Sequence, residues 1–173
     1  MEFMNLTEIA KEIHENAVAH GWWEEDRPAY EIIALIHSEW SEALEEYRAG
    51  RPMIYEGEGG KPEGIAVELI DGVIRILDYL ASCVDVGCIK FDTYKGIKPI
   101  ELPLLIACLH ADTATSLVRS DQDDWDIETN IIAIVAQSVL LWIREQGLDP
   151  LEILRKKHEY NKTRPYRHGG KVC

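Results

Sequence analysis

In Ile65-Ala-Val-Glu-Leu-Ile-Asp-Gly-Val-Ile-Arg-Ile-Leu-Asp78, apolar residues recur at spacings of three and four, which is the period of an α-helix. The same period runs through most of the 173 residues, and strand-like alternation bounded by turns is hard to find. We therefore predict an all-α fold, a helical bundle of about five to six helices.

Capping and helix-breaking residues place the other helices on both sides of this segment. Asn5 is expected to open a first helix that stops near His20, and Pro28 a second one that ends at Gly50. A mobile loop is expected over residues 50–62, with Pro62 opening the helix of the quoted segment. The remaining prediction is a connector over 85–102, helices at 103–118 and 127–146, and a short helix from Asp149 to Tyr160 before a polar tail.

The length fits a single domain over residues 1–173, with 100–147 as an extra helical pair and 161–173 as a basic tail. No apolar run reaches the roughly 20 residues that a membrane helix needs. The N-terminus has no basic-then-apolar leader, so we expect a cytoplasmic protein without a membrane partner. Thirty-one acidic and eighteen basic residues give a formal charge of −13, which disfavours stable nucleic-acid binding.

Two acidic pairs stand at helical spacing on consecutive predicted helices. Glu39 and Glu42 lie three residues apart on the second helix, and Glu68 and Asp71 repeat this spacing on the third. Side chains at i and i+3 project from one face with Cβ atoms roughly 5–6 Å apart, so each pair can share a ligand. A single such pair in an acidic chain is usually a solvated helix face. Two pairs on neighbouring helices favour a metal site between those helices.

The types of ligand narrow the choice of metal. Di-iron sites in bundles use Glu-x-x-His pairs, and no histidine lies three residues after any of the four acids. An all-oxygen set suits Mg²⁺, with Mn²⁺ as a substitute. Because Mg²⁺ tends to bind jointly with substrate phosphates, the predicted site is suited to nucleotide chemistry.

The basic residues of this acidic chain concentrate between Arg155 and Lys171. They could reach phosphate oxygens held at the metal site, or they could form a solvated tail beyond a helix. Trp22 could stack on a base, although adjacent tryptophans more often serve the core. The candidate substrate-binding residues are Lys157, Tyr160, Asn161, Arg164 and Trp22.

The two halves of the chain are weakly alike. Residues 34–39 are echoed by 106–112, and residues 65–78 align with 130–143, apolar against apolar. A degenerate internal duplication would explain this, but any two amphipathic helical hairpins can look equally similar.

Three segments together resemble the MazG-like all-α nucleoside triphosphate pyrophosphohydrolases, a superfamily that includes the dimeric dUTPases. The segments are residues 36–48 (IHSEWSEALEEYR), 61–78 (KPEGIAVELIDGVIRILD) and 156–171 (KKHEYNKTRPYRHGGK). The resemblance implies cleavage of a nucleoside triphosphate between the α- and β-phosphates, giving monophosphate and pyrophosphate, as a housecleaning reaction of the nucleotide pool. It also implies an active site between the second and third helices and a homodimer or homotetramer.

The resemblance further implies a role for each matching residue. Glu39, Glu42, Glu68 and Asp71 would hold the metal, and Lys157, Asn161 and Arg164 would bind phosphates. Many members carry a further Glu directly before the first acid, where this chain has Ser38. The water-activating base is therefore either Glu39 or a metal-bound hydroxide. The alternative function is a non-catalytic partner module that binds a magnesium nucleotide for regulation.

Overall fold

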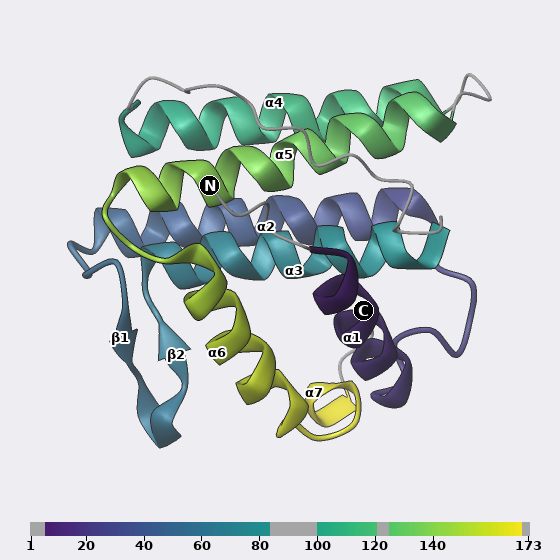
Figure 1. Ribbon diagram of the computed structural model, residues 1–173, viewed down its shortest axis with the longest axis horizontal. Coiled ribbons are helices and arrows are strands. Elements are labelled where there is room, and N and C mark those ends of the chain that lie inside the picture. The colour runs from purple at the N-terminus through teal and green to yellow at the C-terminus, as the bar shows by residue number, and fades with distance from the viewer. Residues whose placement is uncertain (1–5, 84–99, 121–124, 171–173) are drawn as a thin grey trace.

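The structure is a computed structural model, and it describes residues 6–83, 100–120 and 125–170. Over these ranges the chain is mostly helical with one small sheet, which confirms the all-α prediction (Figure 1). The helices are α1 (Leu6–Ala19), α2 (Ala29–Arg48), α3 (Ile65–Cys83), α4 (Leu102–Ser120), α5 (Trp125–Glu145), α6 (Pro150–Lys162) and α7 (Arg167–Gly170).

Four helices form the body of the bundle. Helix α2 packs on α3 and α4 on α5, and the two pairs meet through contacts of α2 with α4 and of α3 with α5. Helices α1 and α6 also pack on α3, and in Figure 1 they lie on the side away from α4 and α5. Helix α3 is therefore central, which explains why most of its residues are buried. The internal duplication remains a prediction.

Trp40 anchors α2 in the core between α3 and α4. Its side chain is 0% exposed, and its indole Nε1 donates a hydrogen bond of 3.1 Å to Thr113 Oγ1 of α4. Gly72 of α3 leaves space for the ring, since a Cβ there would lie 2.3 Å from Trp40 Cζ3. Because Trp40 points into the core, the acids on either side of it, Glu39 and Glu42, are turned toward another face of α2.

The prediction of a mobile loop over residues 50–62 is wrong in part, because this segment contains the first strand of a hairpin. Strand β1 (Tyr55–Glu56) pairs antiparallel with β2 (Pro62–Glu63) around the short 3-10 helix η1 (Glu58–Gly60). The strands escape a search for alternating residues because each has only two residues. Pro62 also lies in β2 instead of opening α3. Gly64, at φ 116° and with a Cβ position 2.7 Å from Met53 O, separates the strand from the helix.

The other helix boundaries are close to the predicted ones. Asp149 caps α6, because its side chain accepts hydrogen bonds from the backbone N–H groups of Leu151 and Glu152. Helix α6 runs past Tyr160 to Lys162, and the predicted tail contains the short α7. The expected start at Asn5 and residues 85–99 of the connector lie outside the described residues.

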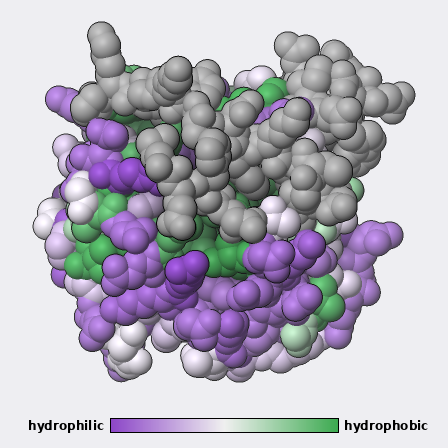
Figure 2. Space-filling view, in the orientation of Figure 1, coloured by the Kyte–Doolittle hydropathy of each residue, from purple (hydrophilic) through white to green (hydrophobic). Residues whose placement is uncertain are grey.

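In the orientation of Figure 1, hydrophilic side chains dominate the lower half of the surface, over α6 and the hairpin (Figure 2).

Within the described residues, no single helix is long and apolar enough to cross a membrane. One bent pair, Thr129–Glu145 with Pro150–Lys162, passes the same test by length and composition only.

Candidate functional site

Three of the four predicted metal ligands come together between α2 and α3. Glu39, Glu42 and Glu68 each offer a carboxylate oxygen, and these oxygens all lie within 4.8 Å of one another. Glu39 is 5% exposed and Glu68 is 7% exposed, whereas Glu42 is open to solvent. The cluster therefore has two buried carboxylates and one that is open to solvent. A cation held there could bind both the protein and a ligand in the pocket.

The fourth predicted ligand, Asp71, points to a different partner. Its Oδ2 lies 2.8 Å from Lys157 Nζ of α6, and that lysine is only 2% exposed. The same ammonium group donates a hydrogen bond of 3.3 Å to the carbonyl of Pro62 in β2. Lys157 therefore joins α6, the hairpin and the acidic face of α3.

Arg75 provides a second cation at the cluster, one that was not predicted from the sequence. Its Nε donates a hydrogen bond of 2.6 Å to Glu39 Oε1. A signal was present in the sequence, since Arg75 follows Asp71 by four residues and Glu68 by seven and so shares their face of α3.

The pKa values of the two buried acids are raised at this site. Burial raises the pKa of Glu68 to about 7, and the neighbouring charge of Asp71 adds to the rise while Lys157 opposes it. Burial also raises the pKa of Glu39, against the opposing charge of Arg75. Burial is the main reason that both carboxyl groups resist ionisation, and a bound cation would favour their charged forms.

The donor set fits the predicted metal. All the cluster ligands are carboxylate oxygens, without imidazole or thiolate, which is the ligand chemistry of Mg²⁺ and Mn²⁺. Burial and the charge of Asp71, which raise the pKa of Glu68, disfavour its ionised form, and a bound divalent cation would offset that cost.

A pocket of about 300 Å³ opens over the cluster. It is lined by residues of α1, α2, α3 and α6, and among them are all four predicted ligands. Of the predicted substrate-binding residues, Lys157, Asn161, Arg164 and Trp22 also line the pocket. Tyr160 is not among its lining residues, because it stands on α6 one position before Asn161 and so points to another side of the helix.

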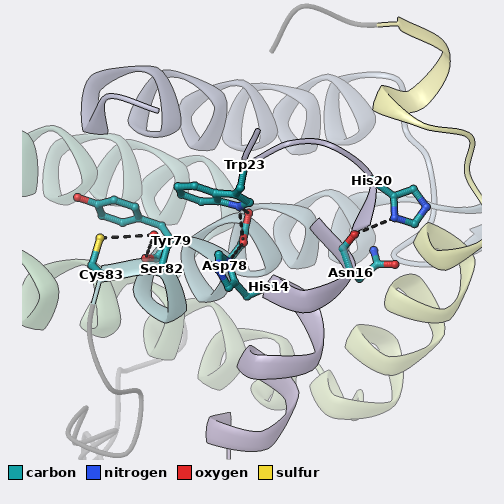
Figure 3. A network of polar contacts seen from close by, with 8 residues as sticks. All are labelled: His14, Asn16, His20, Trp23, Asp78, Tyr79, Ser82 and Cys83. Carbon is teal, nitrogen blue, oxygen red and sulfur yellow. Dashed lines mark hydrogen bonds and ion pairs between the residues drawn. The ribbon is translucent and has the colours of Figure 1, made fainter. Parts of the chain in front are cut away.

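The two adjacent tryptophans occupy different environments. Trp22 lines the pocket, with the His168 ring edge-on at 5.1 Å. The Trp23 indole instead donates to both Asp78 carboxylate oxygens, at 3.0 and 3.1 Å, and His14 Nδ1 lies 2.7 Å from Oδ1 of the same aspartate (Figure 3). Trp23 thus connects the α1–α2 loop to α3, and Trp22 is the one that can meet a ligand.

The segment after α6 is held against the end of α1. His20 Nε2 lies 3.0 Å from the carbonyl oxygen of Arg164, and the Arg167 backbone N–H donates to the His20 carbonyl at 3.0 Å. Arg167 Nε also donates to the carbonyl of Gly21. These contacts place Arg164 and His168 at the pocket, although more than 140 residues separate them from α1.

No known protein-family model, curated protein or solved structure matches this chain. The function is therefore inferred from the residues and their geometry.

The pKa of Glu68 predicts how stability depends on pH in the absence of divalent metal. Because its pKa rises from 4.5 to about 7 on folding, the folded state holds this proton more tightly than the unfolded state. The stabilisation that the Glu68 proton contributes is therefore at its maximum below about pH 4.5, and it is lost as the pH rises through about 7. In EDTA, we expect the difference in unfolding free energy, wild type minus Glu68→Gln, to fall as the pH is raised through this window.

Urea unfolding of both proteins between pH 4.5 and 8 measures this difference. The subtraction removes the contributions of groups that do not interact with Glu68, such as Asp78, because these groups are the same in both proteins. A difference that stays constant with pH would contradict the environment described for Glu68.

Proposed function

We propose that this protein is a Mg²⁺-dependent nucleoside triphosphate pyrophosphohydrolase, which converts a (d)NTP to the (d)NMP and pyrophosphate. The observation that carries this proposal is one pocket in which a carboxylate cluster faces buried and half-buried cations. Such a pocket suits a ligand with several negative charges that binds together with a divalent metal. We place this activity in the cytoplasm, as housecleaning of the nucleotide pool.

Glu39, Glu42 and Glu68 would hold the metal, with Asp71 beside them on α3. Bound Mg²⁺ would neutralise phosphate charge and make a water molecule more acidic. Lys157 and Arg164 line the pocket and would bind phosphate oxygens, and Asn161 can add a neutral hydrogen bond. Trp22, which also lines the pocket, would stack on the base.

The reaction in this proposal is an in-line displacement at the α-phosphorus. A water oxygen forms the new bond to phosphorus, the bond to the α–β bridging oxygen breaks, and its electron pair leaves with pyrophosphate. Glu39 is our candidate to accept the water proton, because burial raises the pKa of its carboxyl group and so makes the carboxylate a stronger base. The hydrogen bond from Arg75 holds this carboxylate in place.

We also propose a homodimer or homotetramer. Leu104 of α4 and Ile134 of α5 are large apolar side chains exposed on the bundle, 56% and 42% respectively, and association would remove such surface from water. Size-exclusion chromatography with light scattering measures the oligomeric state.

The proposed activity predicts that the protein releases pyrophosphate from at least one member of a panel of ribo- and deoxynucleoside triphosphates. The reaction should need Mg²⁺, stop with EDTA and yield the monophosphate in equal amount. Ion-exchange chromatography of the products with a coupled pyrophosphate assay measures this. Release of inorganic phosphate and a diphosphate would contradict α–β cleavage. Nucleotide binding without turnover would instead indicate the regulatory module.

A further inference from the structure

His158 is a buried polar residue without a hydrogen bond at its Nε2. The side chain is 2% exposed and lines the pocket, yet its Nε2 has no partner among the described residues. Asn161 lies three residues further on the same face of α6, lines the same pocket, and has an unpartnered buried Oδ1. Buried polar atoms in native proteins are nearly always satisfied, so two such atoms beside one pocket indicate a missing ligand.

Part of the lining of this pocket is apolar. Residues of α1, among them Ile13, Asn16 and Ala17, line this pocket as well, and Ile13 and Ala17 are apolar. Burial lowers the pKa of His158, and the charge of Lys162 lowers it further. The imidazole is therefore neutral near pH 7 and offers a hydrogen bond, not a charge.

A phosphate is a poor partner for this pair. Phosphate oxygens are only acceptors, and Asn161 Oδ1 is an acceptor as well, so that atom needs a donor. Neutral groups that both donate and accept, such as a hydroxyl or the edge of a base, can satisfy both atoms.

We propose that His158 and Asn161 recognise an uncharged hydrogen-bonding group of the nucleoside, either a sugar hydroxyl or the base edge, and so determine which nucleotide the pocket accepts. This inference rests on the proposed function for the phosphate end of the pocket. With Asn161 Oδ1 bound to the nucleoside, the amide nitrogen of the same side chain is still available for a phosphate.

The test compares His158→Leu and His158→Gln with the wild type by isothermal titration calorimetry in Mg²⁺. The probes are non-hydrolysable α,β-imido triphosphates of ribo- and deoxynucleosides, with inorganic tripolyphosphate as the phosphate-only probe. For His158→Leu we expect binding of the preferred nucleotide analogue to weaken by roughly 10–100-fold, the effect of losing a buried hydrogen bond. Tripolyphosphate binding should not change, and His158→Gln should recover part of the loss.

Glu159→Gln, an exposed neighbour on α6, is the matched control and should bind both probes like the wild type. If His158→Leu loses affinity to different extents for ribo- and deoxynucleotide analogues, the group recognised is a sugar hydroxyl. If the loss of affinity differs between bases, the group recognised is the base edge. Equal weakening of both probes, or no weakening of either, in a variant that melts like the wild type would overturn the inference. Pyrophosphate release by the wild type tests the proposed function separately, because nucleotide recognition is measured here without turnover.

Discussion

Replacement of Glu68 by Gln is expected to abolish pyrophosphate release while leaving the helical circular dichroism intact. Glu68 is buried and is the residue that α3 contributes to the carboxylate cluster. The Gln side chain has nearly the same shape, so it removes the charge without leaving a cavity. Loss of a residue that only supports a metal ligand already costs 10–100-fold in affinity or activity. For a ligand we expect kcat/KM to fall by at least about 100-fold.

The same change should not destabilise the metal-free protein, because it removes a buried charge that the fold accommodates at a cost. Glu45→Gln is the matched control, since Glu45 is an exposed acid one turn beyond Glu42 and pairs with Arg48 on the helix surface. The control should keep full activity. Wild-type turnover by Glu68→Gln at saturating Mg²⁺ would remove Glu68 from the site.

The helices could be predicted because their signals are local. The spacing of apolar residues in α3 and the capping at Asp149 depend on residues within one or two turns. The spacing of Glu39 with Glu42, and of Glu68 with Asp71, is local as well. The hairpin could not be found in this way, because two-residue strands contain no period and depend on the turn and on packing against α3 and α6.

The partners of the acids could not be predicted, since they depend on how distant helices pack. Asp71 meets Lys157 across 86 positions of sequence, and Glu39 meets Arg75 across 36. Local spacing places all four acids toward one interface, but it does not show that one of them is already paired with a buried lysine. His158 carried no signal, because a histidine on an amphipathic helix becomes informative only when its burial and its missing partner are known.

Replacement of Lys157 by Met is expected to have the largest effect on stability. The methionine keeps the apolar stem in its buried position, but it leaves Asp71 without its counter-charge beside Glu68 and Glu39. Breaking a buried ion pair from one side costs 3–5 kcal/mol, and Asp71 retains some exposure, so we expect a loss of about 3 kcal/mol in EDTA. For a chain of this size that corresponds to a fall in Tm of roughly 6–12 °C.

A double-mutant cycle separates the two roles that Lys157 has at this site. If the lysine mainly compensates Asp71, then Asp71→Asn should restore much of the stability of Lys157→Met, with a coupling energy above about 1 kcal/mol in urea unfolding. Additive effects would show that Lys157 is held by its apolar surroundings and by Pro62 instead. Nucleotide binding should behave differently, because neither neutral side chain can attract a triphosphate. The double variant should therefore be stable yet bind tripolyphosphate more weakly than Asp71→Asn alone, which would assign the lysine to the phosphates as well as to the fold.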